Sequence, residues 1–122
     1  MKTVLSIAGT DPTSGAGIQA DLKTVEAHNL YGMSVITAVG AQNTLGVTAV
    51  QPVSPTLVGQ QIDCVFDDIR PDAIKIGMLH NSEIIRTVAA RLRAHHADNI
   101  VLDPVMISSS GHDLLRPDAA KA

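Results

Sequence analysis

Residues 4–22 have the sequence VLSIAGTDPTSGAGIQADL, which predicts a strand, a loop and a helix in succession. The apolar run at residues 4–8 is typical of a short buried strand. A polar loop with several glycines follows at residues 9–17. Apolar residues then recur at the spacing of one helix face, at Ile18, Leu22 and Val25. A strand that leads through such a loop into a helix is typical of an α/β fold.

Strands and helices continue to alternate along the rest of the chain. Short apolar segments rich in β-branched residues predict further strands, at residues 33–39, 47–53, 73–77 and 100–102. Ser54 and Asn81 are predicted to cap two further helices, and Gly32 is predicted to end the first one. Residues 116–122 have the pattern of one more helix. The alternation predicts a largely parallel sheet, with residues 33–53 as an antiparallel excursion from it.

The composition indicates a globular, cytoplasmic protein. A chain of 122 residues, 45% apolar and 17% charged, has the length and balance of one folded domain. Its net charge of −3, with no basic block, argues against binding of nucleic acid. No apolar stretch approaches the roughly 20 residues that a membrane span needs. The single cysteine, Cys64, excludes an internal disulfide and favours a reducing compartment.

The candidate site is the rim formed by the carboxyl ends of the predicted strands, where open α/β sheets bind their ligands. Each major predicted strand leads into polar residues, glycine or methionine, namely Thr10 and Asp11, Gln42 and Asn43, Gly77 and Met78, and Asp103, Val105 and Met106. The periodicity of apolar residues does not require polar residues, glycine or methionine to follow every major strand. The alternative interpretation is that loops are polar in any protein.

Four residues of this region carry specific chemistry. Gln42 offers an acceptor beside a donor pair, which matches an aminopyrimidine edge, although a glutamine can also cap loop backbone. Asp103 could bind Mg²⁺ or cap a loop. Asp21 lies near the start of the first helix, where a negative charge is favourable in any case. Lys75 lies inside an apolar strand, so we expect it either to pair with a carboxylate of the rim or to extend to solvent.

The glycine loop does not match a nucleotide-binding motif. Residues 15–20 fit the pattern G-x-G-x-x-A, but the loop before them is too long for the tight turn of the dinucleotide fingerprint. The second strand is also followed by no acidic residue, and no Gly-Lys-Ser/Thr of a P-loop occurs. The loop is still expected to bring backbone N–H groups and a helix N-terminus to a ligand, which favours an anionic or polar group.

Several sequence blocks, in order, resemble one known family. The blocks are AGTDP at 8–12, GAGIQADLK at 15–23, SVITA at 34–38, AQNT at 41–44, KIGML at 75–79, VLDPVM at 101–106, and Ser110-Gly111 followed by Leu114-Leu115. Together they resemble the hydroxymethylpyrimidine/phosphomethylpyrimidine kinases, the thiamine-biosynthesis members of the ribokinase-like family. The resemblance covers essentially the whole chain and implies a three-layer α/β/α fold with a mostly parallel sheet and a small β flap.

The resemblance also implies an activity and a set of roles. The family uses ATP and Mg²⁺ to phosphorylate 4-amino-5-hydroxymethyl-2-methylpyrimidine and then its monophosphate, and its members are often homodimers. By resemblance, Gln42 would contact the aminopyrimidine edge, and the ring would be lined by Ala16, Met78 and Val105. Asp21 would lie near the hydroxymethyl group, and Asp103 near Mg²⁺ and phosphate. The flap would partly cover the substrate and exclude water, which competes as a phosphoryl acceptor.

The chain departs from the family pattern in one respect. No Gly-Thr-Gly loop occurs in it, although the family uses such a loop for its anion hole and catalytic base. We therefore expect residues 1–122 to be the N-terminal portion of a single ribokinase-like domain, without the catalytic base and most of the ATP site. An open sheet edge then predicts poor solubility or self-association. Two alternatives remain: a pyridoxal-type kinase, and a non-catalytic fragment that binds the pyrimidine.

Overall fold

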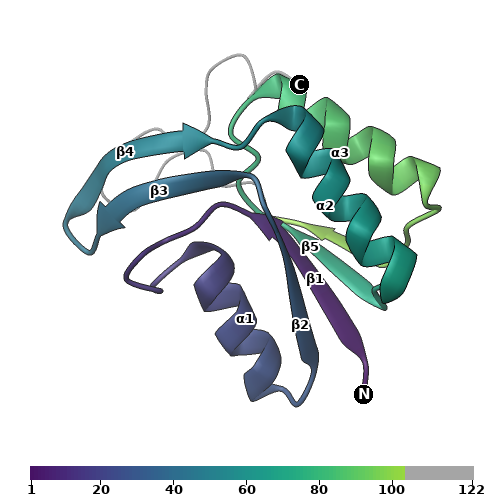
Figure 1. Cartoon of the computed structure of the whole chain (residues 1–122). Helices are drawn as coiled ribbons and strands as arrows, with labels where there is room; N and C mark the ends of the chain where they lie inside the picture. Colours follow the sequence, from purple (N-terminus) through teal and green to yellow (C-terminus); the bar gives the residue numbers. More distant parts are fainter. Residues whose placement is uncertain (104–122) are drawn as a thin grey trace.

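A four-stranded parallel sheet forms the centre of the computed structural model, which describes residues 1–103 (Figure 1). The strand order is β2-β1-β5-β6, with the bounds β1 Thr3–Ala8, β2 Tyr31–Ile36, β5 Ala73–Ile76 and β6 Ile100–Leu102. Each neighbouring pair runs parallel, so all four carboxyl ends meet at one rim. The predicted helix at residues 116–122 lies outside the described residues.

Helices cover both faces of this sheet (Figure 1). On one face lies α1 (Gly17–Ala27), and on the other lie α2 (Pro55–Asp68) and α3 (Ser82–Ala94). Alternation along β1 explains the two layers, because Leu5 and Ile7 join the core with α2 and α3 while Ser6 bonds to α1. The predicted three-layer α/β/α arrangement is confirmed. None of the helices within residues 1–103 is both long and apolar enough to cross a bilayer.

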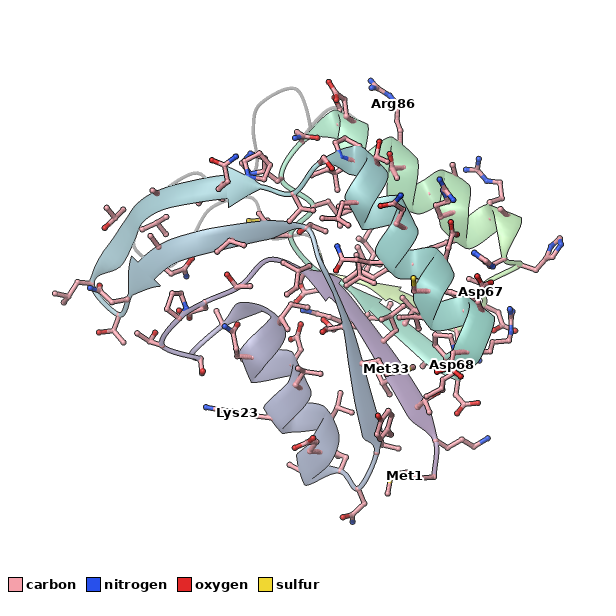
Figure 2. All side chains as sticks on the ribbon, viewed as in Figure 1. Met1, Lys23, Met33, Asp67, Asp68 and Arg86 are labelled. Atoms are coloured by element: carbon pink, nitrogen blue, oxygen red, sulfur yellow. The ribbon has the colours of Figure 1, made fainter. Side chains whose placement is uncertain are left out.

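The main core is aliphatic, as the composition requires. Its buried members come from the sheet and from the inner faces of α2 and α3, and include Leu5, Ile7, Val35, Val58, Ile62, Ile74, Ile84, Val88 and Leu92. The predicted caps are present, since the side chains of Ser54 and Asn81 accept hydrogen bonds from the N–H groups of Leu57 and Ile84. Charged side chains such as Lys23 and Asp67 point outward from the helices (Figure 2).

The prediction that Gly32 ends the first helix is wrong. The helix ends at Ala27, and the chain turns at Asn29, whose φ is 59°. Gly32 lies inside β2, opposite Val4 of β1. A Cβ atom at this position would lie 2.8 Å from Cδ2 of Leu22, so the glycine allows α1 to pack closely on the strand.

The predicted strand 33–39 is in fact parts of two strands in two sheets. The main sheet keeps β2 as far as Ile36, and the chain then leaves it at Thr37. An antiparallel ribbon follows, formed by β3 (Ala38–Asn43) and β4 (Gly46–Pro52), and it projects from the carboxyl end of the main sheet (Figure 1). Only this ribbon is the antiparallel excursion that was predicted for residues 33–53.

Thr37 joins the sheet, the ribbon and the loop after β5. Its side chain is fully buried, and its Oγ1 donates to the carbonyl oxygen of Met78 at 2.7 Å. Its backbone N–H donates to Ala8 O at 2.9 Å, and its carbonyl accepts from the N–H of Val53 at 2.8 Å. These three hydrogen bonds fix the direction in which the ribbon leaves the main sheet.

The two outer edges of the main sheet differ. At the carboxyl end of β2, the Gln61 carboxamide accepts from the N–H of Ile36 at 3.0 Å and donates to its carbonyl at 2.9 Å. A side chain there takes the place of a neighbouring strand. At the other edge, the β6 residues Ile100, Val101 and Leu102 are 43%, 62% and 62% exposed.

Candidate binding site at the carboxyl ends of the strands

A cavity of about 90 Å³ lies at the carboxyl ends of β1 and β5, with Gln42 of the ribbon in its wall. Its walls are made by Ala8, Gly9, Thr10, Asp11, Ala16, Gly17, Gln42, Lys75, Gly77 and Met78. Three of the predicted site residues, Ala16, Gln42 and Met78, are therefore brought together from α1, the ribbon and the loop after β5. Pockets for drug-sized ligands measure about 300–1,000 Å³, so a cavity of this volume suits a single small ring.

Two glycines let the backbone close around this cavity. At Gly9, a Cβ atom would lie 2.4 Å from Cε of Met78. At Gly17, φ is +62° and a Cβ atom would lie 2.6 Å from the carbonyl oxygen of Gly9. That carbonyl accepts from the N–H of Ile18 at 2.9 Å and so ties the end of β1 to the start of α1. A larger residue at Gly17 would push the start of α1 away from the end of β1, whereas one at Gly9 would displace the Met78 side chain from its place in the wall.

The N-terminus of α1 is occupied by a carboxylate of the protein itself. Asp11 is only 5% exposed, and its Oδ2 accepts from the N–H of Ala16 at 2.9 Å. Its Oδ1 accepts from the N–H and the Oγ1 of Thr13, both at 3.0 Å. The positive end of the helix dipole thus already has a negative partner. The expectation that this helix end favours an anionic or polar ligand group stays a prediction, and the structure adds the Asp11 carboxylate beside it.

Gln42 reaches the cavity from β3 through an irregularity of the ribbon. The strand register shifts between Ala41 and Gln42, because Ala41 pairs with Ala49 and Gln42 with Val47. A bulge of this kind redirects the neighbouring side chains. Within residues 1–103, the Gln42 carboxamide makes no hydrogen bond, so the alternative that it caps a loop has no support there. Its donor and acceptor are available to a ligand.

Asp21 lies below the cavity and is paired with Lys75. The Lys75 Nζ lies 3.1 Å from Oδ1 and 3.0 Å from Oδ2 of Asp21, and Ser6 Oγ donates to Oδ2 at 2.6 Å. The first of the two alternatives for Lys75, pairing with a carboxylate, is therefore correct. Lys75 is part of the cavity wall, whereas Asp21 is not.

The remaining predicted site residues follow β6. Asp103 is exposed at the same rim, and its N–H donates to the carbonyl of Ile76 at 2.9 Å, but it is not in the cavity wall. Val105 lies outside the described residues. Among residues 1–103, no group of three His, Cys, Asp or Glu side chains is arranged to hold a metal ion.

Asp11 and Thr37 hold the backbone beside the cavity through hydrogen bonds that the sequence analysis did not predict. For Asp11 a signal was present, because an aspartate two residues before a threonine commonly bonds to the backbone N–H at that position. For Thr37 no local signal exists, since its partners Ala8, Val53 and Met78 are distant in sequence.

Comparisons with known proteins give one family. Residues 11–122 match the family model described as phosphomethylpyrimidine kinase. The chain is 56% identical over 115 residues to the hydroxymethylpyrimidine/phosphomethylpyrimidine kinase of Salmonella typhimurium, which covers 94% of this chain and 43% of that protein. The protein of the same name from Bacillus subtilis is 50% identical over 115 residues, covering 94% and 42%. The chain thus spans less than half the length of these curated relatives.

The similar solved structures include both a phosphomethylpyrimidine kinase and pyridoxal kinases. The crystal structure of a phosphomethylpyrimidine kinase from Clostridium difficile matches with a TM-score of 0.92 and 50% identity, covering 99% of this chain and 52% of that one. A pyridoxal kinase from Staphylococcus aureus, in complex with AMP-PCP, matches with a TM-score of 0.81 and 37% identity, covering 99% and 43%.

Proposed function

The chain belongs to the phosphomethylpyrimidine kinase family, and we propose that its cavity binds 4-amino-5-hydroxymethyl-2-methylpyrimidine. The protein of which this chain carries the matching portion would transfer phosphate from ATP to the hydroxymethyl group, and then to the resulting monophosphate, in thiamine biosynthesis. The observation that carries the proposal is the Gln42 carboxamide, which has no partner within residues 1–103 and faces a cavity of single-ring size.

The chemistry of the wall supports this ligand. Ala16 and Met78 offer apolar contacts to a flat ring, and Gln42 offers an acceptor to the amino group and a donor to the adjacent ring nitrogen. Val105, outside the described residues, is proposed as a further ring contact. We assign no catalytic residue in this chain, and the base is proposed to lie in the remainder of the family's fold.

Asp103 is the residue proposed to hold Mg²⁺. Magnesium in phosphoryl-transfer sites is commonly bound by one or two carboxylates, with phosphate oxygens and water as its other ligands. A single exposed carboxylate at the rim fits that donor set, and Asp21 does not, because its oxygens are taken by Lys75 and Ser6. When bound, the ion neutralises the charge of the transferred phosphoryl group.

Binding of the pyrimidine tests the assignment directly. We expect Gln42→Ala to weaken binding of hydroxymethylpyrimidine to the 122-residue chain by about tenfold, because two hydrogen bonds of about 0.5–1.5 kcal/mol each are lost. Gln51→Ala is the matched control, since Gln51 is an exposed glutamine of β4, outside the cavity wall. Calorimetric titration measures both. Unchanged affinity in the Gln42 variant would show that another group contacts the ring.

Pyridoxal is the second candidate ligand, because the chain also resembles a pyridoxal kinase. Titration with pyridoxal under the same conditions distinguishes the two candidate ligands. Tighter binding of pyridoxal than of hydroxymethylpyrimidine would favour pyridoxal as the ligand. Incubation with ATP, Mg²⁺ and hydroxymethylpyrimidine then tests turnover. We expect binding without formation of the monophosphate, and robust turnover would contradict the expectation that the catalytic base lies elsewhere.

A further inference from the structure

We propose that Lys75 donates a hydrogen bond to the hydroxymethyl oxygen of the bound pyrimidine, and that Asp21 and Ser6 position Lys75 without touching the substrate. The inference rests on the proposed function and assigns a role within the same site. It replaces the expectation that Asp21 itself lies at the hydroxymethyl group.

The surroundings of Lys75 aim its ammonium group at the cavity. Lys75 lies in β5 between the buried residues Ile74 and Ile76, and its side chain is 29% exposed on the face that carries α1. A Cβ atom at Gly77 would lie 3.1 Å from Lys75 Nζ, so the glycine leaves the space at the end of the strand open. The ammonium can therefore meet a ligand that enters from the rim.

The other charged residue in the cavity wall is already engaged. The Asp11 carboxylate accepts hydrogen bonds from Thr13 and Ala16 and is nearly fully buried. An ammonium group has three N–H donors, and the two short contacts of Lys75 go to the oxygens of one carboxylate, Asp21. A donor remains for a ligand oxygen. Among the described residues of the cavity wall, Lys75 is thus the charged side chain that can donate a hydrogen bond to a ligand.

Charge balance indicates which ligand atom is bound. The carboxylate of Asp21 neutralises Lys75 at about 3 Å, so the pair presents a polarised N–H with little net charge. Such a donor suits a neutral alcohol oxygen. Gln42 approaches from the ribbon and Lys75 from the main sheet, so the ring edge and its hydroxymethyl substituent are contacted by different elements.

The test compares two ligands that differ by one hydroxyl. Hydroxymethylpyrimidine and 4-amino-2,5-dimethylpyrimidine are titrated into the 122-residue chain and into Lys75→Met, which keeps an unbranched side chain without the charge. Hydrogen bonds to charged groups are the stronger ones, so we expect Lys75→Met to bind the hydroxymethyl compound about tenfold to a hundredfold more weakly. Its affinity for the dimethyl compound should stay within about twofold. Lys23→Met, on the outer face of α1, is the control and should change neither affinity (Figure 2).

The positioning residues are tested by the same comparison. Asp21→Asn and Ser6→Ala should each lower affinity for the hydroxymethyl compound less than Lys75→Met does, again without affecting the dimethyl compound. Lys75→Arg should restore part of the difference. A purely structural role would weaken both compounds equally, and that result would overturn the proposal.

A measurement on the unmodified chain makes the test independent of how well the variants fold. The NMR signals of the Lys75 Cε–Hε group should move when the hydroxymethyl compound binds and stay nearly unchanged with the dimethyl compound. Equal shifts with both would overturn the inference about Lys75 and leave the proposed function standing. Failure of the unmodified chain to bind either compound would instead overturn the proposed function, and this inference with it.

Discussion

Replacing Thr37 with valine removes one hydroxyl group from the junction of the two sheets and leaves its size almost unchanged. The Oγ1 of Thr37 donates to the carbonyl of Met78 at 2.7 Å, and the side chain is fully buried. In the variant this partly buried carbonyl loses its donor, and leaving a polar group unsatisfied costs about 1–3 kcal/mol when it is buried. With a urea dependence of about 1–3 kcal/mol per molar for a small domain, a loss of about 2 kcal/mol lowers the unfolding midpoint by about 1 M.

Urea unfolding followed by circular dichroism measures this effect, with Thr24→Val as the matched control. Thr24 also donates to a backbone carbonyl, that of Ala20 at 3.0 Å, but it lies on the exposed face of α1, where water replaces the bond. The control should change stability by less than about 0.5 kcal/mol. Because Met78 is part of the cavity wall, Thr37→Val should also weaken pyrimidine binding. Equal midpoints for the two variants would refute the reasoning.

Three other perturbations test separate parts of the structure. Gly17→Ala should destabilise the chain by more than about 1 kcal/mol, because the left-handed conformation penalises a Cβ atom. Gly15→Ala is the control, since a Cβ atom there would meet only an ordinary contact at 3.7 Å. Similar urea midpoints for the two variants would contradict this prediction. The hydrogen bond from the Thr3 N–H holds the pKa of Asp72 below its ordinary value of 3.8, so the carboxylate stabilises the fold at neutral pH and that contribution is lost as the pH falls through the lowered pKa. Asp72→Asn should therefore be less stable than the unmodified chain at pH 7 and equally stable well below pH 3.8, and a difference that persists in acid would refute this cause. Val101→Lys, on the exposed strand β6, should reduce self-association in sedimentation velocity, whereas a chain that is already monomeric and unaffected by the change would show that this edge does not drive association.

The local sequence pattern was sufficient to locate the helices and strands. It was insufficient to show where the chain leaves one sheet for the other. The apolar periodicity, together with Ser54 and Asn81 as caps, correctly located the helices α2 and α3. Residues 33–39 contain no glycine, proline or charge, so nothing in that run marks the point where the chain leaves one sheet for another. The break at Thr37 is set by hydrogen bonds to Ala8 and Val53, which only the assembled fold brings near.

The sequence predicted which residues come together at the cavity, but not the pairing of Lys75 with Asp21 next to it. The parallel strand order places all carboxyl ends at one rim, and Ala16, Gln42 and Met78 meet there as expected. Lys75 and Asp21 are 54 residues apart in the chain, and their pairing depends on which face of β5 lies under α1. Strand alternation alone leaves that face undetermined, and the place of Asp21 near the hydroxymethyl group was expected only from the family resemblance.

The Gln61 side chain blocks part of one edge of the main sheet, so the two edges differ in whether they can pair with another strand. The hydrogen bonds from Gln61 to Ile36 prevent another strand from pairing along the whole of β2, whereas within residues 1–103 the outer edge of β6 is unpaired. A further strand that joined this sheet along its full length would therefore pair with β6. The cavity lies at the ends of β1 and β5, the two middle strands, so β2 and β6 separate it from both edges and a strand added beside β6 would leave its walls unchanged.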